Sequence, residues 1–277
     1  MTAGSSTAAV IAIKPMEHAK SRLAVPDPLR RRLAWTMALD TLSALCRALP
    51  HVLVVSDQPA LEARLRRAGL AVEVISESGH FGINSALNRG ASCLRAQGFT
   101  SILACVGDLP ALRSESVARI VAASRDHPRS FVADASGVGT TMLVAHDVEL
   151  TPQFQGRSAA AHHASGAVSL LAEAIGSPVA DARCDVDTEA DLAAAIELGV
   201  GPATSALIDH ARGRLGRYLL ITATQWSNAD GDQLAVTSSG TRIALPADAL
   251  RGELRHAQLG QRLHAVEADG RVLSVWL

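Results

Sequence analysis

Two acidic segments have the residue types and spacing of a site that binds a divalent metal. Residues 101–110 form an apolar run of strand length that ends on Asp108 and is followed at once by Pro110. Residues 184–188 place Asp185 and Asp187 on the same side of an extended chain. Ligands of open α/β sheets bind outside the carboxyl ends of the strands, and Mg²⁺ prefers hard oxygen ligands. The two segments therefore predict a metal cradle of three carboxylates.

A turn and a helix cap explain the same residues without a metal. Gly-Asp-Leu-Pro forms an Asx-type turn after a strand, and Asp187 or Thr188 caps a helix that begins near Glu189. We favour the metal because one α/β chain carries two such segments. Mg²⁺ usually takes one or two carboxylates together with substrate phosphates, so a phosphate-binding segment is expected nearby.

A basic turn that follows the first predicted strand meets this expectation. It carries Lys14, Lys20 and Arg22 but neither glycine-rich phosphate fingerprint. Doubly wound folds bind nucleotide phosphates at this turn, and Arg presents a bidentate fork to phosphate oxygens. The three cations are predicted to neutralise a nucleotide triphosphate. The alternative is an ordinary solvated basic loop.

A nucleotide contact is also predicted for residues 78–87, which follow another predicted strand. Gly82 allows the backbone to approach the nucleotide closely, and the Asn84 amide is able to reach a base or ribose edge. The alternative for Asn84 is a helix cap.

Two further polar segments are candidates for binding a small anionic acceptor. The glycine-rich segment 135–141 and the loop 154–163 supply hydroxyls and backbone amides. The alternatives are a glycine turn and a surface loop. His162 and His163 are interpreted as surface or helix-start histidines rather than metal ligands.

The elements that position these residues alternate short apolar runs with longer amphipathic segments, the rhythm of a βαβ protein with a mostly parallel sheet. The predicted strands are 9–13, 51–55, 72–75, 102–106, 130–133, 141–145 and 179–182. The predicted helices are 29–49, 59–68, 84–97, 114–124, 166–175 and 189–198. The fold class is α/β, with a Rossmann-like core.

The pattern changes near residue 209, which predicts a core domain of residues 1–208 and a small β domain of residues 209–277. A short basic connector, 210–217, leads into predicted strands 218–226, 233–237, 241–245, 261–267 and 271–276, with a hairpin signal at 268–270. Five such strands resemble an OB or cold-shock barrel. Nucleic-acid-binding barrels stack bases on aromatic side chains, which are sparse here. We therefore expect packing or contacts within a homo-oligomer instead of nucleic-acid binding.

Composition narrows the class of protein. The chain has 277 residues, of which 48% are hydrophobic, so a substantial core is expected. A net charge of −1 gives no general attraction to nucleic acid or to an anionic membrane. The four cysteines have no metal or disulfide spacing, and the sequence shows neither a bilayer-length apolar segment nor a signal peptide. A cytoplasmic protein without membrane contact is predicted.

Taken in order, these motifs resemble the guanylyltransferases of deazaflavin coenzyme F-420 biosynthesis. The likeness covers roughly residues 10–206. It rests on the basic turn 14–23 and on residues 82–86, 107–110, 130–134, 139–140, 165–167, 184–188 and 198–204. That family is similar in fold to the molybdenum-cofactor guanylyltransferases, which have a Rossmann-like nucleotidyltransferase core.

The resemblance implies transfer of GMP from GTP to phosphoenolpyruvate, 2-phospholactate or 3-phosphoglycerate, followed by a downstream transferase that accepts the unstable product. It implies Mg²⁺ on Asp108, Asp185 and Asp187, with Asp108 and Lys20 acting in catalysis and Gly107 joining the GTP site. The acceptor would be held by Thr140, Gln155, Gly156 and Ser158. Many relatives carry glycine where this chain has Gln155, with Gly156 one position later, so the acceptor stays open among the three acids.

The sequence is also compatible with three rival functions. The first is another nucleotidyltransferase of the same fold that uses CTP or a sugar phosphate. The second is nucleic-acid binding through the C-terminal barrel, and the third is a non-catalytic scaffold. The three acids at predicted strand ends disfavour the scaffold.

Overall fold

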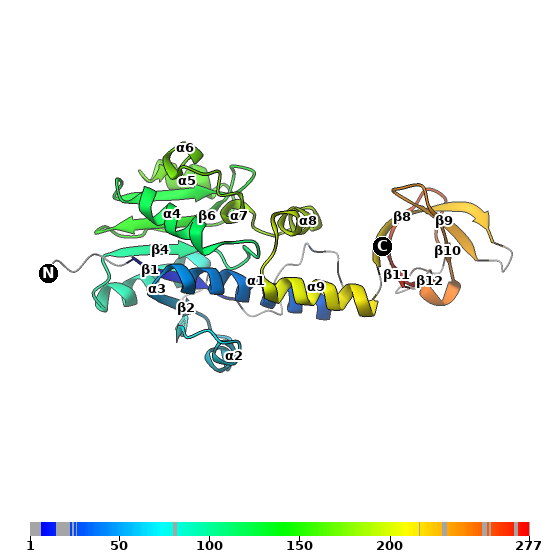
Figure 1. Ribbon diagram of the computed structural model, residues 1–277, viewed down its shortest axis with the longest axis horizontal. Helices are drawn as coiled ribbons and strands as arrows, with labels where there is room; N and C mark the ends of the chain where they lie inside the picture. Colours follow the sequence, from blue (N-terminus) through cyan, green and yellow to red (C-terminus); the bar gives the residue numbers. More distant parts are fainter. Residues whose placement is uncertain are drawn as a thin grey trace. The chain divides into compact units, whose positions relative to one another are not determined.

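The computed structural model describes residues 7–14, 23, 25, 27–79, 82–215, 217–228, 232–250, 254, 256–268 and 271–276. The chain divides into two compact units, Met1–Ser205 and Ala206–Leu277 (Figure 1).

The described part of the first unit contains a seven-stranded sheet in the order β3-β2-β1-β4-β6-β5-β7. Its strands are β1 (Thr7–Ala12), β2 (His51–Val55), β3 (Glu73–Ile75), β4 (Ser101–Cys105), β5 (Arg129–Ala133), β6 (Thr140–His146) and β7 (Val168–Ser169). Only β6 runs antiparallel to its neighbours within this sheet. The mostly parallel sheet predicted from the sequence is thus confirmed.

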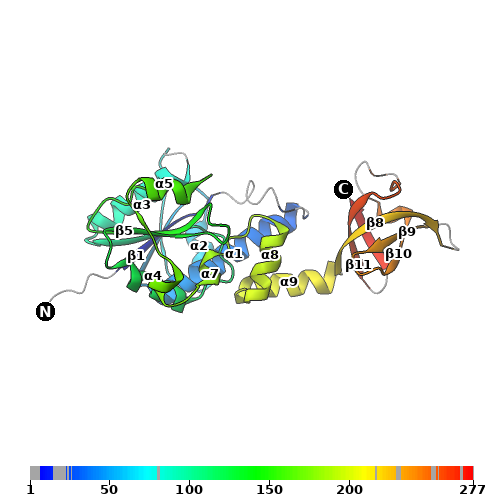
Figure 2. The same cartoon turned by 90° about the horizontal axis from the view of Figure 1, so that it is seen from above.

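Helices cover both faces of the sheet. The helices of the described residues are α1 (Asp27–Ala48), α2 (Leu61–Arg67), α3 (Ile83–Ala96), α4 (Ser114–Ser124), α5 (Ser158–Ala164), α6 (Ala172–Ile175), α7 (Ala180–Arg183), α8 (Glu189–Leu198) and α9 (Pro202–Leu215), the last of which begins in the first unit and continues into the second. Helices α3 and α5 pack on one face, and α1 and α4 pack on the other (Figure 2). Alternate strand residues supply the two cores, as Val10 and Ile11 of β1 do.

Helix α3 approaches the sheet so closely that one of its positions must lack a side chain. A Cβ added at Gly90 would lie 2.3 Å from Cγ2 of Val10 and 2.9 Å from Cγ2 of Val55. Such distances are far inside van der Waals contact, so glycine sets the spacing of α3 from β1 and β2.

Three short predictions of secondary structure are wrong, in addition to the loop predicted at 154–163, where α5 begins at Ser158. Where a strand was predicted at 179–182, residues 180–183 form helix α7, because the Asp181 carboxylate accepts hydrogen bonds from Arg113 N (2.9 Å) and Ser116 Oγ (2.9 Å) at the start of α4. Residues 166–175 form β7 and α6 where one helix was predicted. The connector 210–217 is largely the continuation of α9 to Leu215.

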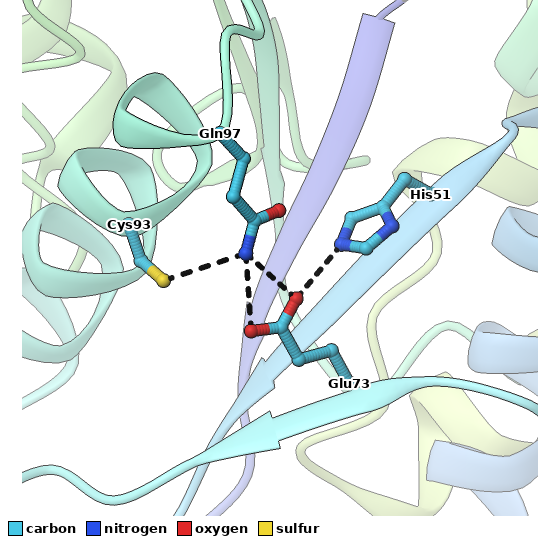
Figure 3. Close-up of polar contacts among 4 residues, drawn as sticks. All are labelled: His51, Glu73, Cys93 and Gln97. Atoms are coloured by element: carbon cyan, nitrogen blue, oxygen red, sulfur yellow. Dashed lines mark hydrogen bonds and ion pairs between the residues drawn. The ribbon is translucent and has the colours of Figure 1, made fainter.

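A polar cluster ties the edge strand β3 to the rest of the sheet. The Glu73 carboxylate accepts hydrogen bonds from Gln97 Nε2 (2.9 and 3.1 Å) and faces His51 Nε2 at 3.1 Å (Figure 3). His51 also stacks on Phe99, with 5.2 Å between ring centroids. The cluster lies where β2 and β3 begin, so it is at the opposite end of these strands from the predicted site.

The second unit contains an antiparallel sheet in the order β10-β9-β8-β11-β12. Its strands are β8 (Arg217–Ser227), β9 (Gln233–Thr237), β10 (Arg242–Leu245), β11 (Arg262–Ala268) and β12 (Arg271–Trp276). Leu250, which follows β10, forms a parallel bridge with Val275 of β12. Ile221, Ala235, Leu263 and Val275 are among the residues of its own small core. The turn positions 269–270 of the predicted hairpin lie outside the described residues.

Among the described residues, no single helix has the length and apolar character needed to cross a bilayer. The pair α8 and the first part of α9, bent by 115° at their break, meets that requirement by length and composition alone.

Candidate active site

The structure brings the two acidic segments together. The backbone N–H of Val186 donates to the carbonyl oxygen of Asp108 (N···O 3.1 Å), which joins residues 184–188 to the exit of β4. Burial raises the pKa of the Asp185 carboxyl to about 7, assisted by the negative charges of Asp108, Asp134 and Asp187. Four carboxylates therefore share one neighbourhood.

The second acidic segment reaches this position from a helix, so the prediction that it follows a strand is wrong. The Arg183 guanidinium, at the end of α7, donates to the carbonyl oxygens of Ala133 (3.1 Å) and Asp134 (2.9 Å), and the Arg183 carbonyl accepts from Ala135 N (2.8 Å). These bonds fix the chain beside the end of β5. Residues 184–186 then span from β5 to the loop that carries Asp108.

A helix cap accounts for one of the polar residues in this segment. Thr188 is the N-cap of α8 and forms a capping box with Asp191. The cap interpretation is thus correct for Thr188. The Asp191 carboxylate also accepts from the backbone N–H of Asp187 (3.1 Å), which fixes the start of the helix directly after the acidic pair.

Asp134, which was not among the predicted site residues, also belongs to the acidic neighbourhood. Its carboxylate accepts hydrogen bonds from Ser136 Oγ (2.9 Å), Val138 N (3.0 Å) and Gly139 N (2.9 Å), and so builds the turn that leads into β6. A Cβ at Gly139 would lie 2.6 Å from Oδ2 of Asp134, so the turn needs glycine there. The sequence pattern that could have indicated Asp134 is an acid at the end of an apolar strand, the same pattern that indicated Asp108.

The carboxylate oxygens of these acids suit a divalent cation whose remaining ligands come from the substrate. Among the described residues, no three His, Cys, Asp or Glu side chains form a ready-made ligand group, so the predicted three-carboxylate cradle is not preformed. Mutual repulsion of these acids opposes ionisation of Asp185, and a bound cation would reverse that effect. Two carboxylates with phosphate oxygens are a common ligand set for Mg²⁺.

The basic turn begins beside the acidic loop. Strands β1 and β4 are parallel, with Ile11 opposite Cys105, so Lys14 and Asp108 both follow these adjacent strand ends. A Cβ at Gly107 would lie 3.9 Å from the carbonyl oxygen of Ala12. Lys14 also lies near the exit of β3, where its positive charge opposes the rise in the pKa of Glu77 that burial causes. Lys20 and Arg22 lie outside the described residues.

Gly82 and Asn84 lie at the start of α3. Gly82, with a φ of 104°, is its N-cap, so the interpretation of Asn84 as the cap is wrong. The Asn84 amide instead holds the backbone of Phe154, accepting from its N (2.7 Å) and donating to its carbonyl oxygen (3.0 Å). A nucleotide contact of Asn84 stays a prediction. A cavity of about 670 Å³ runs along α3 and is lined by Ile75, Ser85, Asn88, Arg89, Ser92 and Cys93.

The segments predicted to hold the acceptor meet at a buried histidine. Thr140 Oγ1 lies 2.9 Å from Nδ1 of His162, and the same ring receives a hydrogen bond from the backbone N of Gln153 (2.8 Å). His162 is fully buried, which corrects its interpretation as a surface residue, whereas His163 is exposed. Ser158, also buried, begins α5 in the segment predicted to be a loop.

Gln155 and Gly156 both have left-handed backbone, with φ of 106° and 57°. This conformation strains a residue that has a Cβ by about 1–3 kcal/mol. We expect Gln155→Gly to raise the free energy of unfolding by about 1 kcal/mol, since the strain relieved exceeds the added chain entropy of glycine. Denaturant unfolding measures this change.

Gln153→Gly is the matched control for this prediction. Gln153 is two positions away and is not among the residues with positive φ. Glycine there should lower stability by about 0.5–1 kcal/mol. Equal destabilisation by the two variants would contradict the strain at Gln155.

Comparisons with known proteins identify the family of this chain. The family model described as "Guanylyl transferase CofC like" matches residues 7–209. The phosphoenolpyruvate guanylyltransferase of Streptomyces coelicolor is 43% identical over 204 residues, which are 72% of this chain and 93% of the relative. That of Mycolicibacterium smegmatis is 39% identical over 210 residues, covering 75% and 92%.

Among solved structures, one described as a nucleotide-diphospho-sugar transferase from Desulfovibrio desulfuricans matches with a TM-score of 0.57. The match covers 76% of this chain and 96% of that structure at 13% identity. At this identity the likeness shows a shared nucleotidyltransferase-like α/β fold alone.

Proposed function

We propose that this chain, which belongs to the CofC-like guanylyl transferase family, transfers GMP from GTP to phosphoenolpyruvate in coenzyme F-420 biosynthesis. The observation that carries the proposal is the joining of two acidic segments next to the strand end that bears Lys14. The names of relatives about two-fifths identical support phosphoenolpyruvate over the two other acids.

The reaction is an in-line displacement at phosphorus. A phosphate oxygen of the acceptor attacks the α-phosphorus of GTP, a new P–O–P linkage forms, and the bond between the α-phosphorus and the bridging oxygen breaks to release pyrophosphate. The acceptor phosphate is already deprotonated, so no nucleophilic side chain and no covalent enzyme intermediate is required. The protein has to position two anions and neutralise the charge between them.

Asp108 and Asp185, with Asp187 beside them, would hold a divalent cation, and Mg²⁺ suits these oxygen donors. When bound, such a cation would neutralise negative charge on the phosphates. The chain's own residues do the remaining work. Lys14, Lys20 and Arg22 bind the GTP phosphates, with Gly82, Asn84 and Gly107 completing the GTP site, and Thr140, Gln155, Gly156 and Ser158 bind the acceptor.

The assignment is tested by offering substrates separately. The purified protein is incubated with Mg²⁺, one nucleotide (GTP, CTP or ATP) and one acceptor (phosphoenolpyruvate, 2-phospholactate, 3-phosphoglycerate or a sugar phosphate). Products are identified by mass spectrometry, with the downstream transferase added to trap an unstable product. We expect product from GTP and phosphoenolpyruvate. Product from CTP or a sugar phosphate alone would establish the rival nucleotidyltransferase.

Removal of the Lys14 charge should weaken GTP binding. Lys14→Ala is expected to raise the KM for GTP about tenfold, since a charge-assisted phosphate contact is lost, while Lys14→Arg retains most of the affinity. Lys20→Ala should act in the same direction. Steady-state pyrophosphate release measures both. Unchanged GTP kinetics in both alanine variants would contradict the phosphate role.

The sequence offers a second readout for the same prediction. Lys14 and Lys20 are the two lysines of the whole chain. A lysine-acylating reagent followed by mass spectrometry therefore reports on this turn and the α-amino group alone. GTP with Mg²⁺ should protect both lysines, and equal labelling with and without GTP would oppose the assignment.

We infer that residues 209–277 form an additional domain with the OB-type strand order. The order β10-β9-β8-β11-β12 and the parallel bridge between Leu250 and Val275 support this topology. Leu234 and Val236 on β9 are aliphatic where a nucleic-acid-binding barrel carries stacking aromatics, which supports a role in packing or in a homo-oligomer.

This domain should be dispensable for guanylyl transfer. A chain shortened to residues 1–215 keeps all of α9, and we expect its kcat and both KM values to be unchanged. Pyrophosphate release and analytical ultracentrifugation measure activity and association of the two chains. Loss of turnover in a folded shortened chain would show that the second unit takes part in the reaction.

A further inference from the structure

One buried imidazole connects the two segments assigned to the acceptor. His162 of α5 is 0% exposed and lies between Thr140, the first residue of β6, and Gln153, in the loop that precedes α5. Its Nδ1 is 2.9 Å from Thr140 Oγ1, and its Nε2 is 2.8 Å from Gln153 N. The rings of Phe131 and Phe154 pack against it, with centroids 5.8 and 5.2 Å away.

The backbone partner fixes where the ring carries its proton. The Gln153 N–H donates, so Nε2 must present a lone pair. A neutral imidazole with a bare Nε2 carries its hydrogen on Nδ1, so the ring acts as a donor toward Thr140 Oγ1, as it also does toward the backbone of Ser158. Burial, followed by the positive charge of Arg129, lowers the pKa of His162 to about 4, which keeps the ring neutral at physiological pH.

This tautomer dictates what the Thr140 hydroxyl does. Because Oγ1 accepts the hydrogen bond from the ring, its own proton is directed to another acceptor. Thr140 directly follows the turn that the Asp134 carboxylate holds, at the edge of the acidic neighbourhood. A hydroxyl fixed as a donor at this place suits an anionic oxygen of a substrate.

The same ring also fixes the loop. His162 binds Gln153 from α5, and Asn84 of α3 binds both backbone groups of the next residue, Phe154. Two helices thus hold the backbone immediately before Gln155 and Gly156, whose left-handed conformations are strained or need glycine. The loop reaches Gln155–Gly156 in one defined geometry.

We propose that His162 is a positioning residue for the acceptor: it sets the Thr140 hydroxyl as a donor to the phosphorylated carboxylic acid and holds Gln153 so that the following residues face it. This proposal rests on the proposed function. His162 itself contacts no substrate and acts through Thr140 and the loop.

Three substitutions separate the two tasks of the ring. His162→Asn places an amide N–H near the position of Nδ1 and retains donation to Thr140. His162→Gln extends an amide oxygen toward Gln153 N and retains that contact. His162→Ala removes both. His163→Ala, on the exposed neighbouring position of the same helix, is the matched control.

Kinetics with the full chain give the first readout. His162→Ala should raise the KM for phosphoenolpyruvate about 10- to 100-fold, the range for loss of hydrogen bonds to a charged ligand, with the KM for GTP unchanged. His162→Asn should recover most of the loss, and Thr140→Val should add little to His162→Ala. An equal rise in both KM values, no recovery by Asn or Gln, or full additivity would overturn the proposal.

Nuclear magnetic resonance of the ¹⁵N-histidine-labelled protein gives a readout that needs no turnover. His162, assigned by loss of its signals in His162→Asn, should show the Nδ1–H tautomer and no titration between pH 8 and pH 5.5. An Nε2–H tautomer, or titration near the ordinary value of about 6.5, would overturn the proposal even if the enzyme is active.

Absence of turnover with every acid would instead defeat the proposed function. Calorimetric binding of phosphoenolpyruvate to wild type and His162→Ala would then decide the positioning role, and equal affinities would overturn it.

Discussion

Asp108→Asn should lower kcat by about 10³-fold or more while leaving the fold intact, because the variant removes a metal-binding charge without changing the shape of the side chain. Asp108 raises the pKa of Asp185, so loss of its charge relieves repulsion within the metal-free protein. Thermal stability should therefore be equal to or slightly above that of the wild type. Pyrophosphate release and thermal unfolding measure the two effects.

The control is Asp126→Asn, an exposed aspartate between α4 and β5, next to the amino end of β5 instead of the carboxyl ends that form the site. It should retain wild-type turnover. Purified Asp108→Asn with wild-type activity would refute the metal assignment. A folded but inactive Asp126→Asn would show that a general loss of negative charge, and not loss of a metal ligand, lowers the turnover of Asp108→Asn.

The second large effect is expected on stability. The Asp40 carboxylate of α1 is 5% exposed and accepts hydrogen bonds from Ala203 N (3.0 Å) and Thr204 N (2.8 Å), the first amides of α9 after Pro202. A Cβ at Gly201 would lie 2.4 Å from Cγ of Asp40, so the cap is tightly enclosed. Asp40→Ala should lower the free energy of unfolding by about 3 kcal/mol, since two amides near the helix start lose charge-assisted bonds.

Thermal and denaturant unfolding of the full chain test this expectation, with a fall in Tm of about 6–12 °C. Asp40→Asn preserves the shape and one acceptor oxygen, so its loss should be smaller. Equal stability of Asp40→Ala and the wild type would show that the cap contributes nothing. The exposed ion pair of Arg66 with Glu62 gives the contrasting case, because its removal should change stability by less than about 0.5 kcal/mol.

Elements whose ends carry their own signals were predictable from the sequence. Helices 114–124 and 189–198 have the bounds that were predicted, and the second begins at a Thr188–Asp191 capping box. Residues 179–182 carried no such signal. A short apolar run has too few residues to distinguish a strand from a helix, and the contacts of Asp181 with α4 determined the outcome.

The candidate site was predictable to the same extent. Asp108 follows the apolar strand β4 as its local context predicted, whereas Asp185 was picked out by a strand prediction at 179–182 that is wrong, since it follows helix α7. The link between Thr140 and His162 spans 22 positions and has no local pattern, so the sequence placed both residues in separate loops. Asp134 was visible as a strand-end acid, but its bonds to Gly139 and Val138 become apparent only when the turn is folded.

The outer strands of the large sheet also bear on how this protein behaves at high concentration. β3 has three residues and begins with Glu73, whose carboxylate is tied to His51 and Gln97, and β7 has two residues. Strands this short present few unpaired backbone groups, and a charged side chain at the border opposes the approach of another chain. The large sheet therefore resists edge-to-edge aggregation.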